Sequence, residues 1–343
     1  MDITKLRKNS LFVGRAATAI YLILQTLMKE KEVILPSNIC YAAVYPIIYS
    51  GNIPVFVDID KNTGNASFEK ILEKINSNTG AIIFPYMYGN VAKDILKLKE
   101  YCQSNGIVLI EDCASVMNAK VENKNVGTIG DYAVFSTGHA KIIDVGNGGI
   151  LLTDKNIDYI IEEYNKLDLY NDKIGCQLNE FSKQYRILRN EENDKKIKEF
   201  FNKNYRNLFL YKIDKTVIDK MKKELENEKN IKEERTKKYK MFKNSLHKSD
   251  LYELLEFEEG STPWRFTMLI KNKKYKKELI QILLENKLFV SDWYPCIGKS
   301  FSDDIYPNSD NMEKEILNFS LTDDEENILK ICEIINDYFR RKN

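Results

Sequence analysis

The sequence is poor in the residues that build metal centres and disulfide frameworks. It holds two histidines in 343 residues, and its six cysteines are scattered without a C-x-x-C pair. Two histidines argue against a histidine-based metal site, and scattered cysteines in a chain of this length indicate buried free thiols rather than disulfides. We therefore expect no bound metal.

Long apolar runs and an excess of one charge are also missing. No apolar run approaches the length of a membrane span, and the N-terminus lacks the apolar core and small-residue cleavage site of a secretory signal. Charged residues make up 30% of the chain but leave a net charge of only +1, so no overall field favours nucleic acid or a membrane surface. The sequence predicts a cytoplasmic globular protein that binds neither.

Apolar strands alternate with helical segments through the first 154 residues. We expect strands at 33–35, 54–57, 81–84, 107–111, 132–135 and 150–153. Helices are expected between most of them, the strongest over residues 15–29. This alternation predicts an α/β fold with βαβ units and a mostly parallel sheet covered by helices on both faces. Ligands of such sheets bind outside the carboxyl ends of the strands.

The composition changes after Asp154. Residues 155–240 are rich in Lys, Glu and Asn and are expected to form long solvated helices. Strands at 264–270 and 288–291 around a helix at 274–285, with a closing amphipathic helix at 323–340, predict a smaller α/β unit. We therefore expect a large domain over residues 1–240 and a small C-terminal α/β domain over 241–343.

Three chemically useful side chains follow neighbouring strands between Ile107 and Asp154. Asp112 and Ser136 end two strands, and Lys141 lies on the next loop. A site for pyridoxal phosphate (PLP) needs a lysine that forms a Schiff base, a carboxylate that keeps the pyridine nitrogen protonated, and a phosphate cradle made of a helix N-terminus and hydroxyls. Lys141, Asp112, and Ser136 with the helix start at 14–17 can fill these roles. Taken singly, these residues fit a generic α/β ligand site as well.

The order of several short segments resembles one known family. These segments are EVILP, GNIPVFVDID, IIFPYMYGN, VLIEDCA and NVGTIGDYAVFS, followed by Lys141 and GNGG. In this order they resemble the DegT-like (DegT/DnrJ/StrS) sugar aminotransferases, which are fold-type I PLP enzymes. The resemblance runs from about Gly14 to Asp154 and more loosely to the C-terminus. It implies that Lys141 forms the Schiff base, that Asp112 pairs with the pyridine nitrogen and that Ser136 binds the phosphate.

The chain departs from the family pattern at several cofactor positions. Where many members carry Ser-Gly-Thr at the first phosphate-binding turn, this chain has Arg15-Ala16-Ala17. Backbone N–H groups or Arg15 would therefore have to bind the phosphate. Cys40 occupies the position that often stacks an aromatic ring on the cofactor, and Ser115 the position of an expected glutamine. These differences indicate a divergent branch of the family rather than a dead enzyme.

Several candidate residues have a second interpretation that the sequence leaves open. Lys141 and Asp112 are also compatible with a solvated loop lysine and a turn aspartate, and Arg15 with a surface ion pair. His139 fits a structural loop as well as a substrate or phosphate contact. The aromatic residues that either line a substrate cleft or pack in the core are Tyr41, Tyr88, Trp293 and Tyr294.

The resemblance implies transfer of an amino group, from an amino acid such as L-glutamate, to a keto-sugar attached to a nucleotide. It also implies a homodimer with shared active sites, although the segment that reaches the partner in the family differs here, at 175–180. Two alternatives remain: a sugar dehydratase or deoxygenase of the same family, and a homologue that binds PLP without turnover. Lys141 disfavours the first, because certain dehydratases carry a histidine there.

Two further possibilities concern the substrate and the cofactor. A keto-cyclitol without a nucleotide also fits the family as the amino acceptor. A nicotinamide-dependent dehydrogenase is disfavoured, since no G-x-G-x-x-G follows the first strand.

Overall fold

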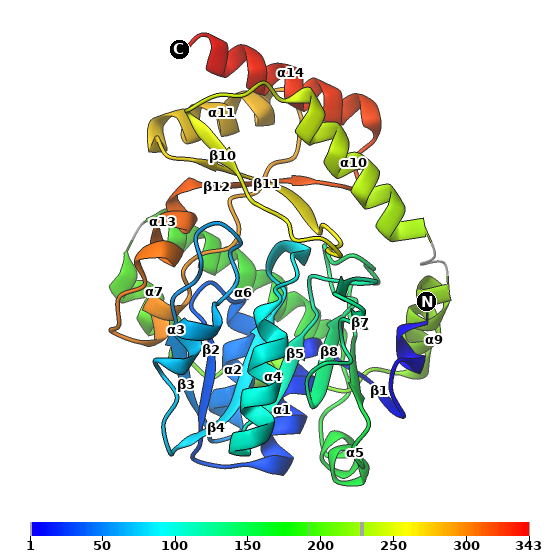
Figure 1. Ribbon diagram of the computed structural model, residues 1–343. Helices are drawn as coiled ribbons and strands as arrows, with labels where there is room; N and C mark the ends of the chain where they lie inside the picture. The colour runs from blue at the N-terminus through cyan, green and yellow to red at the C-terminus, as the bar shows by residue number, and fades with distance from the viewer. Residues whose placement is uncertain (1, 192, 227–229, 343) are drawn as a thin grey trace.

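The computed structural model describes residues 2–191, 193–226 and 230–342, and its centre is a seven-stranded sheet in the order β1-β9-β8-β5-β4-β2-β3 (Figure 1). The pairs β3–β2, β2–β4, β4–β5 and β5–β8 are parallel, whereas β8–β9 and β9–β1 are antiparallel. The predicted mostly parallel sheet is therefore confirmed. The strands are β1 (Asn9–Val13), β2 (Glu32–Pro36), β3 (Ile53–Val57), β4 (Thr79–Pro85), β5 (Val108–Asp112), β8 (Tyr132–Ser136) and β9 (Gly149–Thr153).

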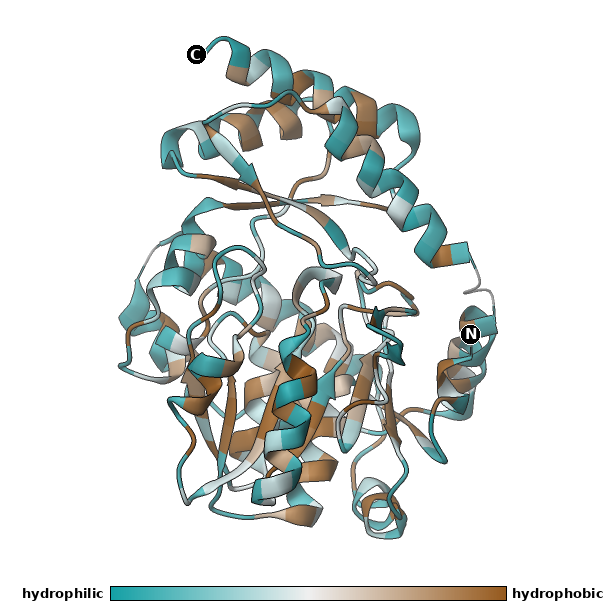
Figure 2. Cartoon of the chain, viewed as in Figure 1, coloured by the Kyte–Doolittle hydropathy of each residue, from teal (hydrophilic) through white to brown (hydrophobic). Residues whose placement is uncertain are grey.

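Helices cover both faces of this sheet, as Figure 1 shows. Successive residues of a strand point to opposite faces, so Ile82 and Phe84 of β4 pack in one core while Ala81 and Ile83 pack in the other. Burial on both faces explains why these strands are continuous apolar runs, and the hydropathy colouring of Figure 2 shows the same apolar centre. The helices of this part are α1 (Ala16–Leu27), α2 (Tyr41–Tyr49), α3 (Phe68–Leu72), α4 (Asp94–Asn105) and α5 (Asp158–Asn165).

The charged segment that follows is helical in its described part. Its helices are α6 (Asp172–Asn190), α7 (Asp194–Phe201), α8 (Arg206–Phe209), α9 (Lys215–Glu226) and α10 (Ile231–Ser245). These helices are less solvated than predicted, because Phe181 and Tyr185 of α6 and Phe200 and Phe201 of α7 are buried in one cluster with aromatic rings of α2. Within the described residues, no helix combines the length and the apolar character that crossing a membrane requires.

The C-terminal part forms a second, three-stranded antiparallel sheet in the order β10-β11-β12. It packs with α10, α11 and α14 around a core of its own, at the top of Figure 1. The two-domain division remains our proposal, and the expected boundary after residue 240 lies inside α10. The other elements of this part are β10 (Tyr252–Leu254), β11 (Arg265–Ile270), α11 (Lys273–Glu285), α12 (Gly298–Phe301), α13 (Pro307–Glu315), β12 (Ile316–Ser320) and α14 (Glu325–Arg340). A small antiparallel hairpin, β6 (Lys120–Val121) and β7 (Lys124–Asn125), lies between β5 and β8 in the sequence.

One expected strand is absent from the described residues, and strands β1, β10 and β12 were not predicted. Strand β1 has no predicted counterpart, because it is an edge strand in which only Val13 is buried, so its apolar pattern is weak. Residues 288–291 were expected to form a strand. Instead only Ser291 forms an isolated bridge, to Asn318 of β12.

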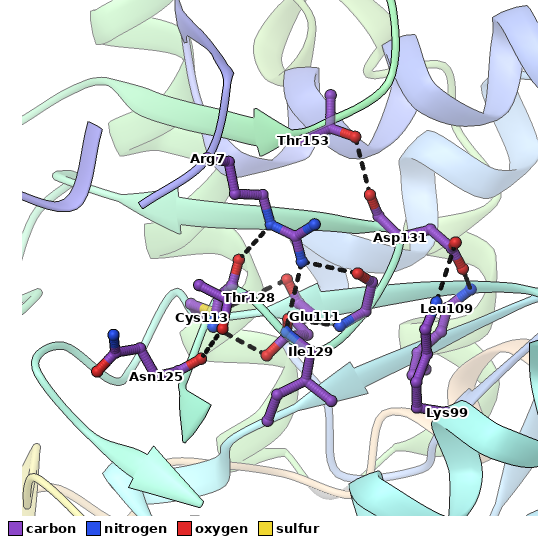
Figure 3. A network of polar contacts seen from close by, with 12 residues as sticks. Arg7, Lys99, Leu109, Glu111, Cys113, Asn125, Thr128, Ile129, Asp131 and Thr153 are labelled. Atoms are coloured by element: carbon purple, nitrogen blue, oxygen red, sulfur yellow. Dashed lines mark hydrogen bonds and ion pairs between the residues drawn. The ribbon is translucent and has the colours of Figure 1, made fainter. Parts of the chain in front are cut away.

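Glu111, at the end of β5, anchors a network of buried polar contacts (Figure 3). Its carboxylate, 0% exposed, accepts hydrogen bonds from three backbone N–H groups of the turn 127–130 at 2.7–2.9 Å and from the Tyr86 hydroxyl at 2.6 Å. Arg7 lies 3.6 Å from the same carboxylate and donates to two carbonyl groups of the turn at 2.7 Å. The turn is therefore held through its N–H groups and its carbonyl groups together.

Replacement of this buried carboxylate should be costly. Glu111→Gln keeps the shape but turns one acceptor oxygen into an NH2 group that faces N–H donors. We expect the free energy of unfolding to fall by about 3 kcal/mol, as for a broken buried ion pair. Urea unfolding of this variant, compared with Glu326→Gln at an exposed position, measures the loss. Equal midpoints for the two variants would show that the network contributes little.

Candidate active site

The carboxyl edge of the large sheet gathers the residues that the sequence singles out. Asp112 is the last residue of β5 and Ser136 the last residue of β8, which are adjacent parallel strands. Lys141 lies on the loop 137–148 between β8 and β9. These strand ends and this loop bring the three side chains to one edge of the sheet.

The direct contacts of the Lys141 ammonium within the described residues are with neutral groups. Nζ lies 3.4 Å from Ser115 Oγ and 3.5 Å from the Tyr294 hydroxyl, and 5.2 Å from the centre of the Trp264 ring. Among the described residues no carboxylate lies within 4.0 Å of it to form an ion pair. Loss of the lysine proton therefore breaks no salt bridge with the described residues.

Asp112 is a buried acid, 7% exposed, with one oxygen unused. Oδ1 accepts a hydrogen bond from the Ala114 N–H at 2.9 Å, while Oδ2 has no hydrogen-bond donor in the part of the chain that the structure describes. Burial raises the pKa of Asp112, and the Ala114 hydrogen bond and the charge of Lys141 offset part of this effect. Burial lowers the pKa of Lys141, but Tyr294, Cys40 and Asp112 outweigh it, so the net pKa lies above the ordinary value.

The first turn of α1 is packed against the loop that carries Lys141. Gly148 donates its N–H to the Gly14 carbonyl at 3.0 Å. A Cβ on Gly149 would lie 2.4 Å from the Arg15 carbonyl carbon and 2.5 Å from the Ala16 nitrogen, so only glycine permits this approach. Arg15 is the N-cap residue and its side chain does not cap the helix. The first-turn N–H groups, those of Ala16 and Ala17 included, therefore lack a side-chain cap.

Arg15 itself is half-buried and makes no ion pair with the described residues. Its guanidinium lies 5.6 Å from the centre of the Phe209 ring. The alternative of a surface ion pair therefore finds no support in its surroundings. A half-buried cation without an acid suits an anionic ligand.

Cys40 and Tyr41 begin α2 beside this edge. Burial raises the pKa of the half-buried Cys40 thiol, and the charges of Lys141 and Arg15 lower it in part. Tyr41 packs in an aromatic cluster, with centroid distances of 5.2–6.1 Å to Phe181, Tyr185, Phe201, Phe209 and Trp293. Its ring and that of Trp293 are therefore part of the packed wall beside the site.

Two candidate residues lie at opposite extremes of solvent exposure. His139 has a side chain that is 91% exposed, and its Nδ1 lies 3.4 Å from a carboxylate oxygen of Asp144. Tyr88 is fully buried, and its hydroxyl lies 3.6 Å from the Met312 sulfur. His139 thus faces solvent, whereas Tyr88 is a core residue under the site.

Ser136 keeps a local contact, since its Oγ accepts a hydrogen bond from the Gly138 N–H at 3.3 Å.

Trp264 is a residue near Lys141 that the sequence did not single out. It lies just before β11, and its contact with Lys141 joins positions more than 120 residues apart. The only signal was an aromatic residue at the start of a predicted strand, which fits core packing equally well.

Residues 5–335 match the model of the DegT/DnrJ/EryC1/StrS aminotransferase family. The chain belongs to this family. A GDP-perosamine synthase from Vibrio cholerae is 35% identical over 162 residues, which cover 47% of this chain and 43% of that protein. An L-glutamine:2-deoxy-scyllo-inosose aminotransferase from Streptomyces kanamyceticus is 38% identical over 122 residues, 36% of this chain and 28% of that protein. The matched segments thus span less than half the length of these relatives.

Solved structures of similar fold cover almost the whole chain. The Helicobacter pylori aminotransferase PseC superposes with a TM-score of 0.77 at 14% identity, over 99% of this chain and 89% of that one. The E. coli GDP-4-keto-6-deoxy-D-mannose-3-dehydratase with bound hydrated PLP reaches a TM-score of 0.71 at 20% identity, over 97% and 89%. At these identities the likeness shows the shared fold.

The buried acid predicts a pH-dependent stability effect in the cofactor-free chain. Because burial raises the pKa of Asp112, its ionised form destabilises the fold above that pKa, and the cost disappears below the ordinary aspartate pKa. Asp112→Asn, which retains Oδ1, should therefore be more stable than the wild type at pH 7, with a difference that shrinks as the pH falls.

Urea unfolding at several pH values measures this difference. Asp219→Asn, at an exposed position, is the matched control and should show no such trend. A stability gain for Asp112→Asn that does not vary with pH would contradict the expectation.

Proposed function

We propose that the protein is a PLP-dependent aminotransferase that transfers an amino group, from L-glutamate, to a nucleotide-linked keto-sugar. The observation that carries the proposal is that Lys141 and Asp112 come to the same edge of the sheet without forming an ion pair with each other. The lysine has no carboxylate partner and the acid has one unused oxygen among the described contacts, in a chain of an aminotransferase family.

The residues at the edge fit PLP group by group. Asp112 Oδ2 is free to accept a hydrogen bond from a protonated pyridine nitrogen. The uncapped first turn of α1, with Ala16 and Ala17, offers N–H groups for a phosphate, as helix N-termini do. Ser136 supplies a hydroxyl at the neighbouring strand end. The Arg15 guanidinium would donate charged hydrogen bonds to the phosphate in place of the missing Ser-Gly-Thr hydroxyls. Cys40 and Ser115 would flank the ring.

When bound, PLP supplies an aldehyde that takes up the amino group and a ring that accepts the electrons of the breaking C–H bond. The chain's own residues do the rest. Lys141 Nζ would hold the cofactor, and would accept the proton from the donor α-carbon and deliver a proton to the acceptor carbon. The buried carboxylate of Asp112 would keep the pyridine nitrogen protonated. The aromatic wall of Tyr41 and Trp293 excludes water from this edge.

The acceptor class rests on the names of relatives. One is a GDP-perosamine synthase, and another, from Saccharopolyspora spinosa, is a dTDP-4-dehydro-2,3,6-trideoxy-D-glucose 4-aminotransferase at 32% identity. Both names specify a nucleotide-linked sugar. The inosose aminotransferase favours a keto-cyclitol as the second candidate. We further propose a homodimer, as the family resemblance implies, with the substrate cleft completed by the partner subunit. As the composition predicts, we place it in the cytoplasm.

The role of Lys141 predicts where the cofactor binds. The full chain incubated with PLP should gain an absorbance of the lysine-bound cofactor, and borohydride reduction followed by peptide mass spectrometry should locate the adduct on Lys141. Lys141→Ala should lose the adduct and at least a hundredfold of the rate of amino transfer from L-glutamate. Lys124→Ala, at an exposed position, is the control. A chain that takes up no PLP contradicts the proposal.

The amino acceptor can be identified with the same PLP-loaded protein. The protein in its amino-loaded state is mixed with a panel of nucleotide keto-sugars and keto-cyclitols, and mass spectrometry detects the aminated product. Isotope exchange at the α-carbon of glutamate without any aminated product would favour the dehydratase or deoxygenase alternative. Bound PLP that no amino donor converts would favour the homologue without turnover.

Arg15 should act on cofactor affinity. Because a charged hydrogen bond to a phosphate is worth more than a neutral one, Arg15→Gln should weaken PLP binding by about tenfold. The measurement is the dissociation constant of PLP, determined by titration, with Arg186→Gln at an exposed site of α6 as the matched control. Equal affinities for the two variants would remove Arg15 from the phosphate site.

A further inference from the structure

Three neutral groups surround the Lys141 ammonium, and two of them come from the C-terminal part of the chain. They are the Ser115 hydroxyl at 3.4 Å, the Tyr294 hydroxyl at 3.5 Å and the Trp264 ring, whose centre lies 5.2 Å away. An ammonium carries three N–H donors and no acceptor, so these groups match its bonding capacity. We propose that Trp264 and Tyr294 are positioning residues that hold Lys141 Nζ in its reactive orientation.

Trp264 also fixes the backbone just before the lysine. Its indole Nε1–H donates to the Ala140 carbonyl at 2.7 Å. Ala140 has a φ of +61°, a left-handed conformation that residues other than glycine rarely adopt. Trp264 is itself held to the large sheet unit, since its backbone N–H donates to the Tyr88 carbonyl at 2.8 Å. The indole thus stabilises the strained residue that turns Lys141 toward the site.

Tyr294 is held by ring packing. It is 5% exposed, and its ring centre lies 5.7 Å from that of Trp264 and 6.1 Å from that of Tyr88. The packing leaves the phenol little freedom, so the hydroxyl oxygen has a fixed place near Nζ. A fixed neutral acceptor orients an ammonium without locking its proton in an ion pair.

The three neighbours also set how readily the lysine ionises. Hydroxyl oxygens and an aromatic face both favour the ammonium over the amine. Removing a hydroxyl oxygen or the aromatic ring should therefore increase the fraction of Lys141 present as the neutral amine at neutral pH. The same change should leave the Nζ atom less well oriented. Different substitutions separate the loss of Nζ orientation from the change in the pKa of Lys141.

The test uses the full chain freed of cofactor. Trace acetic anhydride is applied at a series of pH values from about 6 to 11, a range that brackets the ordinary lysine pKa, and mass spectrometry follows acetylation of the Lys141 peptide. Tyr294→Phe removes one oxygen, and Trp264→Leu removes the aromatic face. Each should move the inflection of the Lys141 profile to lower pH by roughly one unit. Trp264→Phe keeps a ring but loses the N–H, so it should change the plateau rate several-fold and move the inflection less.

The matched control is Tyr306→Phe. Tyr306 is also buried, and its hydroxyl contacts Ser302 rather than Lys141. Profiles of Tyr294→Phe and of both Trp264 variants that superpose on the Tyr306→Phe profile would overturn the proposal. If Trp264→Leu does not fold, as judged by circular dichroism, Trp264→Phe and Tyr294→Phe decide the question.

This inference rests on the proposed role of Lys141, but the two can fail separately. A wild-type chain that takes up no PLP contradicts the proposed function and leaves the acetylation profiles readable. Normal uptake of PLP together with unchanged profiles contradicts only the positioning roles of Trp264 and Tyr294.

Discussion

A buried carboxylate, Glu111, is the constraint on which the site depends. It cannot be moved without losing several hydrogen bonds at once, because N–H groups of the turn 127–130 and the Tyr86 hydroxyl all donate to it. Successive strand residues point to opposite sides, so fixing Glu111 fixes the direction of Asp112 as well. The same contact fixes the turn that enters β8, and β8 leads directly to Ser136 and the Lys141 loop. One charge inside the core therefore sets the positions of the cofactor-facing groups.

By contrast, the polar side chains at the carboxyl edge of the large sheet lack some of their hydrogen-bond or ion-pair partners. Asp112 keeps an oxygen without a donor, Arg15 has no acid, and Lys141 has only neutral partners among the described residues. Burial of charge without a partner is unfavourable, and proteins retain such groups where a ligand supplies the missing contacts. The contrast with Glu111, which accepts four hydrogen bonds, separates the residues that hold the fold from those that await a ligand.

The sequence predicted the parallel part of the sheet because strands buried on both faces leave an unbroken apolar signal. Asp112, Ser136 and Lys141 were predicted to share an edge for the same reason, since parallel strands end together. Edge strand β1 carries too little apolar signal, and the exposure of His139 is not readable from its neighbours. Trp264 escaped detection because its approach to Lys141 depends on how the C-terminal sheet packs on the first, and no local pattern encodes that contact.

That packing gives the second sheet a part in the chemistry. The backbone of Trp264 is tied to Tyr88 and its indole to Ala140, so the strained residue before Lys141 is stabilised by a contact between the two parts of the chain. A substitution in the C-terminal core that shifts β11 would then act on the lysine without touching it. The altered phosphate turn does not depend on this contact between the two parts, because Arg15 and the first turn of α1 lie within the large sheet unit. Changes at that turn should therefore affect cofactor retention, and changes around β11 the reactivity of the lysine.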